Sequence, residues 1–272
     1  MTPDRGKRIV LCADDYAQSA AISHGILLLA EQRRLSAVSC FSEGPFWTQA
    51  ANTLPALREH IDIGLHFNLT HPFVDATVTA RPLGAIMRTA MSGRIDRARI
   101  AAALHAQLDR FESVAQAPDF VDGHQHVHLL PGIREVVVSE LAHRYRARTP
   151  YLRAVNPRLP GHGGFVKLLI LKLLGSGFGA LARRRGLRTN RGFAGIYSLE
   201  AQADFTVLMR RWLAAARDGD LLMCHPGSAA DDADDPIAAT RPRELALLRS
   251  AEFGTFLAEN GIRLSRFGDI EH

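Results

Sequence analysis

The chain has 272 residues, of which 47% are hydrophobic, and its formal net charge is +5 at pH 7. This length and composition provide a substantial core and exclude a low-complexity chain, while three widely spaced cysteines exclude a disulfide framework. The first apolar run, at residues 9–12, is too short for a signal peptide, so we expect a cytoplasmic protein.

The basic charge is concentrated in one part of the chain. Residues 141–199 contain twelve Lys or Arg and no Asp or Glu, which leaves 21 basic and 28 acidic residues elsewhere. Such a segment indicates either an anionic partner or a solvated insertion, and the sequence leaves both interpretations open.

Short apolar runs alternate with amphipathic segments along the chain. The runs predict strands over 8–16, 36–43, 61–70, 119–130, 151–156, 219–227 and 261–267, and the segments between them predict helices over 19–35, 45–60, 97–115, 132–147 and 242–260. Ser19 is the predicted N-cap of the first helix. A stretch that contains Pro and Gly, residues 72–93, interrupts the alternation. This order of elements predicts an α/β fold with parallel strands.

Polar side chains follow several predicted strands at their C-terminal ends. Because an α/β barrel builds its site from these ends, we expect one convergent site in an irregular barrel that forms a single domain over residues 1–272. A basic excursion at about residues 157–192 is expected on the face of the site. The sequence has neither a GxGxxG nor a phosphate-loop motif, which argues against nucleotide binding. The strand-end candidates are Asp14, Asp15, His66, Asn68, His124, His126, His128, Arg153 and His225.

Three histidines occupy alternate positions in the stretch FVDGHQHVHLLPG, residues 120–132. On an extended strand His124, His126 and His128 would share one face with Asp122. Buried imidazoles each need a partner, and a divalent metal is an efficient one, so we favour a functional cluster over structural histidines. Alternate strand residues lie roughly 6.5–7 Å apart, so this strand is expected to supply one metal ligand or two. The other histidines would support the ligands or contact substrate.

The remaining ligands must come from other strand ends. The best candidates are His66 and the adjacent pair Asp14–Asp15. Neighbouring residues point in different directions, so one aspartate can bind the metal while the other acts as general base. A turn or a helix-cap pair is the alternative interpretation. Two histidines, one carboxylate and an open position are typical of a hydrolytic metal centre.

Two further strand ends carry ionisable groups. His225 lies between a predicted strand and Pro226–Gly227, where it is either a proton donor to a leaving group or a loop histidine. Arg153 ends the stretch YLR and is suited to hold a substrate oxygen or a carboxylate.

Five motifs together resemble those of a known family. In chain order CADDY, GLHFNLT, VDGHQHVHLLPG, YLRAVN and LLMCHPG resemble the YdjC/ChbG-like carbohydrate deacetylases, over about residues 8–268. The resemblance implies a distorted (β/α) barrel and a metal-dependent hydrolase that removes an N-acetyl group from an amino sugar. The implied substrate is a chitooligosaccharide-like or lipid-linked sugar, since a related branch is associated with hopanoid biosynthesis.

The resemblance also implies roles for individual residues. Carried over by motif, Asp15, His66 and His124 bind one divalent metal ion, with zinc or magnesium favoured. Asp14 is then the base and His225 the acid or a contact to the transition state. The residues that would support these groups or touch substrate are Asn68, His126, His128 and Arg153.

One departure from the family pattern affects the aspartate pair. The family usually reads Asp-Asp-Phe-Gly, whereas this chain has Ala17 in the fourth position. Loss of that glycine is expected to alter the turn after the carboxylates.

Two other classes of function are considered. A metal-dependent phosphoesterase or amidohydrolase would use a His-x-His pair, but such a pair typically ends the first strand, and here the first strand ends in Asp-Asp. A non-catalytic sugar-binding protein would have lost part of the site, yet every expected ligand is present.

The expected partners follow from the same features. An N-acetylated sugar is the substrate, and nucleic acid is not expected, because the basic segment lacks interleaved aromatics. The stretch 165–188 is apolar in its first half and basic in its second, which suits peripheral contact with a membrane. A buried helix with a solvated basic end, or a contact in a homo-oligomer, is the alternative.

Overall fold

The structure is a computed structural model that describes residues 6–73, 76, 79–157, 165–200, 203–228 and 235–270, with the backbone alone at 165–167. Its strands are β1 (Lys7–Tyr16), β2 (Ala37–Cys40), β3 (Asp62–Phe67), β4 (Phe120–Gly123), β5 (Tyr151–Leu152), β6 (Phe193–Ala194), β7 (Leu221–Cys224) and β8 (Ile262–Leu264). Its α-helices are α1 (Ala20–Glu31), α2 (Trp47–Ala51), α3 (Leu83–Met91), α4 (Arg97–Glu112), α5 (Ile133–Arg144), α6 (Phe165–Gly175), α7 (Phe178–Arg184), α8 (Phe205–Ala215), α9 (Arg241–Arg249) and α10 (Ala251–Glu259). Three 3₁₀ turns complete the set: η1 (Pro55–Leu57), η2 (His124–Leu129) and η3 (Phe267–Asp269).

The strands form one parallel sheet in the order β5-β4-β3-β2-β1-β7-β6, and β8 pairs with the first residues of β1. Parallel isolated bridges, Leu152 to Thr189 and Pro157 to Phe193, join the two edges of the sheet. The side-chain amide of Asn190 strengthens this seam, because it exchanges hydrogen bonds with the backbone of Ala154 and donates to the carbonyl of Gly192. The sheet is therefore curled like an irregular barrel, and the predicted α/β fold with parallel strands is confirmed.

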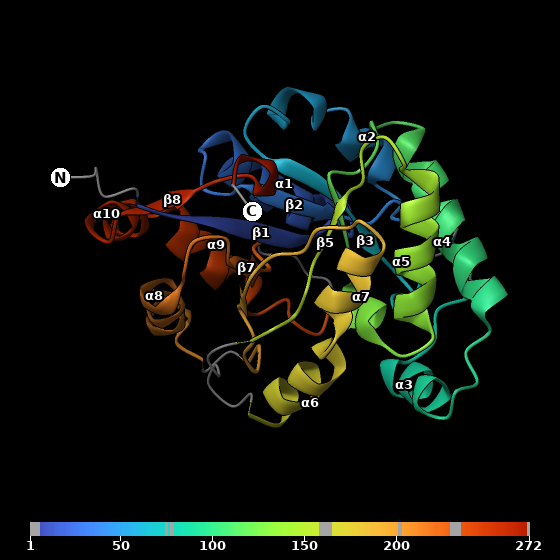
Figure 1. Ribbon diagram of the computed structural model, residues 1–272. Helices are drawn as coiled ribbons and strands as arrows, with labels where there is room; N and C mark the ends of the chain where they lie inside the picture. The colour runs from blue at the N-terminus through green and yellow to red at the C-terminus, as the bar shows by residue number, and fades with distance from the viewer. Residues whose placement is uncertain are drawn as a thin grey trace.

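The core follows from the sequence of the strands. β1, β2, β3, β4 and β7 are buried almost throughout, as expected for parallel strands that helices cover. Figure 1 shows the helices around the outside of the sheet, with α4 and α5 side by side on one flank. The ionisable groups at the C-terminal ends of the strands are consequently carried by rigid, buried elements.

Several helices agree with the sequence and others differ in extent. α1 begins at its predicted N-cap, where Ser19 Oγ accepts the N–H of Ile22. The helix expected over 45–60 is only α2 followed by η1, because Pro55 has no N–H to donate within a continuing helix. The helix expected over 242–260 is divided at Ser250, whose extended backbone ends α9 and whose Oγ caps α10. α3, within 72–93, and α8 were not predicted.

The strand expected over 119–130 is much shorter than predicted. β4 ends at Gly123, and the chain continues as η2, with Gln125 (φ 51°) and His126 (φ 59°) in the left-handed region. His124, His126 and His128 therefore do not share a strand face. This turn brings His124 and His126 to the cavity described below, whereas His128 is buried against the backbone of Arg153.

The basic excursion contributes α6 and α7, although residues 158–164 lie outside the described ranges. α6 lies beside the carboxyl end of the sheet, as its contribution to the site cavity described below requires. Among the described residues, no helix is both long enough and apolar enough to cross a membrane. All three cysteines are free and buried.

Candidate active site

A cavity of about 540 Å³ opens where the buried strands end. Its polar side is lined by residues from three of those ends, including Asp14, Asp15, His66 and His225, and by His124 from η2. The cavity also has an apolar lining, half of which comes from α3 and α6. The apolar lining consists of Leu83, Met87, Leu130, Ile170, Leu171, Leu174, Leu199, Met223, Pro236 and Ile237.

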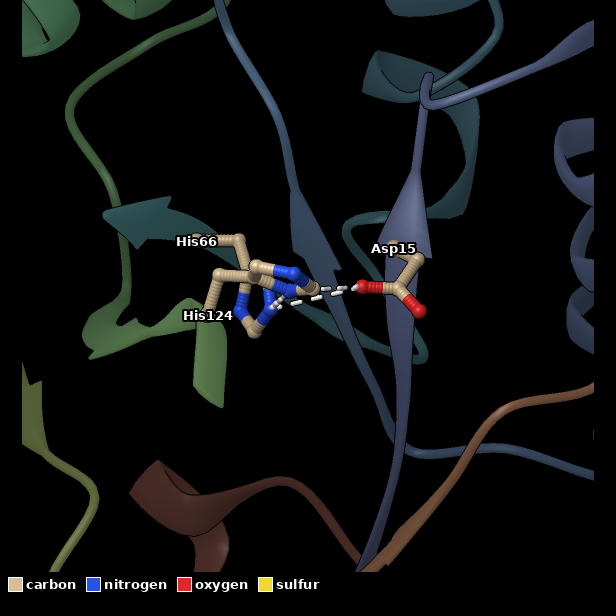
Figure 2. Close-up of side chains that lie close together, drawn as sticks. All are labelled: Asp15, His66 and His124. Atoms are coloured by element: carbon tan, nitrogen blue, oxygen red, sulfur yellow. Dashed lines mark hydrogen bonds and ion pairs between the residues drawn. The ribbon is translucent and has the colours of Figure 1, made fainter. Parts of the chain in front are cut away.

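Asp15, His66 and His124 meet at one point on the polar side (Figure 2). Asp15 Oδ1 lies 3.5 Å from His66 Nε2 and 3.4 Å from His124 Nδ1, and the two imidazole nitrogens lie 3.3 Å apart. Figure 2 shows both rings directed at the same carboxylate oxygen. The structure thus brings together the three residues that the sequence nominated as metal ligands.

This triangle fits a divalent metal ion by its dimensions. Nitrogen and oxygen ligands bind tetrahedral zinc at about 2.0–2.1 Å, which separates any two of them by about 3.3 Å. The three observed separations, 3.3–3.5 Å, match that value. The atoms belong to two imidazoles and one carboxylate, which are common zinc ligands. Because no fourth protein ligand completes the described cluster, an ion held there would keep a position for water or substrate.

Asp122 orients His66 for this task. Asp122 Oδ1 lies 2.6 Å from His66 Nδ1 and also accepts a hydrogen bond from Ser39 Oγ at 2.6 Å. Burial alone would lower the pKa of His66, but the Asp122 carboxylate, with Asp15 and Asp14, raises it to about 10. Ionised Asp122 accepts the Nδ1 proton of His66, so the proton that a metal ion would displace is the one on Nε2.

Asp14 and Asp15 serve different partners because the backbone turns between them. The register of β1 against β2 shifts between Ala13 and Tyr16, and Asp15 has a left-handed φ of 70°. Asp14 faces Arg153, whereas Asp15 faces the histidines. Ala17 is also left-handed, with φ 69°, a conformation that costs a residue with a β-carbon about 1–2 kcal/mol.

Arg153 is fully buried and binds carboxylates of the protein itself. Its Nη1 and Nη2 donate to the two oxygens of Asp14 at 2.6 Å each, and Nη2 also lies 2.6 Å from Asp122 Oδ2. The sequence left open whether Arg153 holds a substrate oxygen or a carboxylate, and in the structure it contacts carboxylates. One guanidinium thereby links the expected base to the carboxylate that orients His66.

The second oxygen of Asp15 is held by an arginine from far along the chain. Arg241, at the start of α9, donates from Nη2 to Asp15 Oδ2 at 2.9 Å and from Nε to Asp235 Oδ2 at 2.5 Å. Burial alone would raise the pKa of Asp15, but Arg241 and the two histidines hold it well below its usual range. Asp15 is therefore an ionised carboxylate whose Oδ1 is directed at the histidines.

His225 follows β7 and lines the same cavity. Its backbone N–H donates to Glu244 Oε2 at 2.5 Å, and Tyr197 Oη donates to the other oxygen of Glu244. Burial raises the pKa of Glu244 to about 7. The imidazole of His225 and the Asp15–His66–His124 triangle thus belong to one site.

The remaining candidates are distributed around this centre. His128 is buried behind it, with Nε2 2.8 Å from the carbonyl of Arg153, and burial lowers its pKa to about 4. His126 lines the cavity and packs edge-on against Phe193. Asn68 folds back on its own loop, where Oδ1 accepts the N–H groups of Thr70 and His71.

Sequence reasoning left three of these residues unassigned. Asp122 was visible in the motif VDGH as a neighbour of the histidines, but its bond to His66 depends on the pairing of β3 with β4. Arg241 and Glu244 lie one helical turn apart on a polar helix, and no spacing in the sequence links them to Asp15 or His225.

Comparison with known proteins gives consistent results. A model of the family described as YdjC-like protein matches residues 8–259. A carbohydrate deacetylase of Mus musculus is 25% identical over 97% of this chain and 95% of its own length. A chitooligosaccharide deacetylase of Escherichia fergusonii is 26% identical over 96% of this chain and 98% of its own. A crystal structure from Enterococcus faecalis V583, described as a candidate cellobiose-phosphate cleavage protein, superposes with a TM-score of 0.73 at 19% identity, over 97% of this chain and 98% of that one.

Proposed function

The chain belongs to the YdjC-like family, and from this premise we propose that it is a metal-dependent hydrolase that removes an N-acetyl group from an amino sugar. The names of its relatives, carbohydrate deacetylase and chitooligosaccharide deacetylase, support the reaction class. The observation that carries the proposal is the triangle of Asp15, His66 and His124 at 3.3–3.5 Å, beside Asp14 and His225 in one cavity.

Asp15 Oδ1, His66 Nε2 and His124 Nδ1 would hold the metal ion. When bound, a divalent ion supplies Lewis-acid polarisation of the acetyl carbonyl and makes a water ligand more acidic. The donor set suits zinc, and its single carboxylate with two imidazoles is less typical of magnesium, which prefers oxygen ligands. Zinc is therefore the ion that we expect to support the reaction.

Asp14 is proposed to accept the proton of the attacking water. Each carboxylate oxygen has two lone pairs. Oδ1 accepts from Arg153 and from the Cys12 thiol, whereas the bond from Arg153 leaves one lone pair on Oδ2 for this transfer. The same contact fixes the direction of the carboxylate, and Asp14 lines the cavity into which the substrate must enter. Positioned proton transfer of this kind contributes about 10²–10⁴ to the rate.

His225 is proposed to protonate the nitrogen that leaves. Attack of water on the acetyl carbon forms a C–O bond, and the C–N bond then breaks to give acetate and the free amine of the sugar. The amine needs a proton as the bond breaks, and an imidazole on the cavity wall can donate it.

The apolar side of the cavity supports a lipid-linked amino sugar over a free chitooligosaccharide. A free sugar offers hydroxyl groups, which a wall of leucine, isoleucine and methionine from α3 and α6 cannot satisfy. An apolar aglycone would cover this wall, and each Å² of apolar surface removed from water would stabilise the complex by about 25 cal/mol. The amino sugar would then occupy the polar side, with its N-acetyl group at the triangle.

The outer surface of α6 supports delivery from a membrane. Leu169 and Leu173 expose 58% and 71% of their surface, and Ile170, on the same helix, is both 40% exposed and part of the cavity wall. The exposed Lys172 and the arginines at the end of α7 give this region positive charge, which suits anionic lipid headgroups. Co-sedimentation with anionic vesicles tests the contact, and equal recovery with and without vesicles would remove it.

The experiment that tests the function is acetate release from a panel of N-acetylated sugars. The panel contains diacetylchitobiose and an N-acetylglucosaminyl lipid, each assayed with and without a chelator. We expect chelator-sensitive release of acetate, with the lipid-linked member preferred. Absence of acetate from every member, with zinc shown to be bound, would contradict the proposal and favour a phosphoesterase or a binding protein.

A further inference from the structure

Two residues of α9 contact the two ends of the proposed reaction centre. Arg241 and Glu244 lie three positions apart, so their side chains leave the same side of the helix. Both are buried, at 2% and 0% exposure, although charged side chains are seldom buried without a specific partner. Their partners belong to β1 and to the segment that follows β7.

Arg241 determines which oxygen of Asp15 is available. Its planar guanidinium spans two carboxylates, with Nε on Asp235 and Nη2 on Asp15 Oδ2. Since Oδ2 is taken, Oδ1 is the oxygen that points at His66 and His124. A carboxylate held in this way can bind an ion through one oxygen in a fixed direction.

Glu244 fixes the backbone at His225. One of its oxygens accepts the N–H of His225, and the other accepts the hydroxyl of the buried Tyr197. The backbone carbonyl of Arg241 accepts the N–H of Gly227 at 3.3 Å, so the same helix holds the His-Pro-Gly segment at a second point. A β-carbon on Gly227 would lie 3.1 Å from Arg241 Cδ, so the segment packs closely on α9.

We propose that Arg241 and Glu244 are positioning residues, which hold Asp15 and His225 at a fixed separation across the reaction centre. The inference rests on the proposed function for His225, whereas the part that concerns Arg241 rests on metal binding alone. Neither residue touches the reacting atoms in this account. Each acts through its partner, Arg241 on the affinity for the metal and Glu244 on the rate of the chemical step.

Charge and orientation make opposite predictions for Arg241. A cation beside a metal ligand repels the metal, so an arginine that acted only by its charge would weaken metal binding, and its removal in Arg241→Met would tighten it. An arginine that acts by orienting Asp15 strengthens metal binding, and its removal in Arg241→Met would weaken it. Arg241→Lys separates the two effects again, because it keeps the charge but replaces a planar fork by a single ammonium that cannot span both carboxylates.

The first test measures the affinity of the full-length apoprotein for Zn²⁺ alone, by competition with a chromophoric chelator. We expect Arg241→Lys and Arg241→Met each to weaken Zn²⁺ binding by about 10- to 100-fold, the range typical of residues that orient a metal ligand. The matched control is Arg243→Lys, the same exchange at an exposed position of the same helix. Wild-type affinity in Arg241→Lys together with tighter binding in Arg241→Met would overturn the role for Arg241.

The second test separates kcat from metal affinity for Glu244. We expect Glu244→Ala to lower kcat by about 10-fold or more with unchanged Zn²⁺ affinity, because it acts through the proton donor. Glu244→Gln should restore most of the rate, since its amide can accept from His225 and donate to the Tyr197 oxygen. Glu259→Gln, on an exposed residue of α10, is the control. Equal loss in the Ala and Gln variants would show a role through charge and overturn positioning.

The two readouts also distinguish this inference from the proposed function. If the wild-type protein releases no acetate from any sugar but Arg241→Lys still weakens Zn²⁺ binding, deacetylation is wrong and the role of Arg241 is supported. If the wild-type protein is active and the variants at both positions match it in kcat and in Zn²⁺ affinity, positioning by α9 is wrong and deacetylation stands.

Discussion

Arg153 and Asp14 form a buried bidentate ion pair, in which two guanidinium nitrogens each lie 2.6 Å from a different carboxylate oxygen. The same guanidinium contacts Asp122, which in turn holds His66. The proposed base and one proposed metal ligand are therefore oriented by a single side chain. This arrangement joins β1, β3, β4 and the residue after β5 at the centre of the site.

Arg153→Lys should separate orientation from charge at this pair. Lysine keeps the positive charge but provides no fork, so Asp14 loses its fixed direction while the buried carboxylates remain compensated. We expect kcat to fall by about 10- to 100-fold, a large part of what a positioned base contributes. The measurements are kcat and the melting temperature of the same variant, which show whether activity is lost while the protein stays folded. The control is Arg148→Lys, at an exposed arginine beside Asp119. An unchanged kcat in a folded Arg153→Lys protein would contradict the role given to this pair.

Asp122→Asn should weaken metal binding. The carboxamide oxygen can face Arg153 only if the NH₂ group turns toward His66, and Nε2 of His66 would then carry the proton and lose its free lone pair. We expect Zn²⁺ affinity to fall by about 10- to 100-fold. Equilibrium competition with a chelator measures this, and Asp109→Asn, at an exposed ion pair with Arg144, is the comparison. A wild-type affinity would mean that Asp122 does not fix the tautomer.

Asp62 should make the folded state less stable as pH rises. Burial raises its pKa to about 7 in the folded protein, against 3.8 for a free side chain. The folded state therefore retains a proton that the unfolded state loses between these values, so this contribution to stability is complete below about pH 4 and is lost as pH rises through 7. We expect urea unfolding to show a smaller loss of stability between pH 5 and pH 8 in Asp62→Asn than in the wild-type protein.

The asparagine at this position remains able to accept the backbone N–H of Phe267, which Asp62 Oδ2 accepts at 2.7 Å. The comparison between the two proteins removes the contribution of other buried groups that titrate in the same range. The prediction would be contradicted if the two proteins lost the same stability over this interval.

Substitutions on the apolar wall should discriminate between substrates. Leu174→Gln introduces a polar group into the apolar lining of the cavity, so it should reduce kcat/KM for a lipid-linked amino sugar more than for diacetylchitobiose. Val207→Gln is the control, because Val207 is exposed on α8, outside both the cavity lining and α6. Equal effects of Leu174→Gln on both substrates would argue against an apolar aglycone.

The sequence predicted the parts of this site that depend only on neighbouring residues along the chain. Each strand end carries its ionisable residue next to an apolar run, so the pair Asp14–Asp15, His66 and the three histidines could be nominated as candidates. The family resemblance then selected Asp15 and His124. The choice among the three histidines could not be derived from an extended strand, because β4 ends at Gly123. The turn of η2 depends on the left-handed conformations of Gln125 and His126, and neither residue type predicts such a conformation.

The supporting residues could not be predicted for a different reason. Arg153, Asp122, Arg241 and Glu244 acquire their roles only when strands and helices distant in the sequence pack together. A single sequence contains no signal for such contacts, since a charged residue on an amphipathic helix is expected to be exposed. The burial of these four charged side chains is therefore what the structure adds to the site.

Asp14→Asn distinguishes a base that is separate from the metal centre from a carboxylate that serves the metal centre itself. Metal content and acetate release should be measured on the same preparation, with the best substrate of the panel and His66→Ala alongside. We predict that Asp14→Asn retains stoichiometric zinc and loses activity by about 10²-fold or more, whereas His66→Ala loses both. Full activity in Asp14→Asn, or undiminished activity in a His66→Ala protein that holds no metal, would contradict metal-dependent deacetylation with Asp14 as the base.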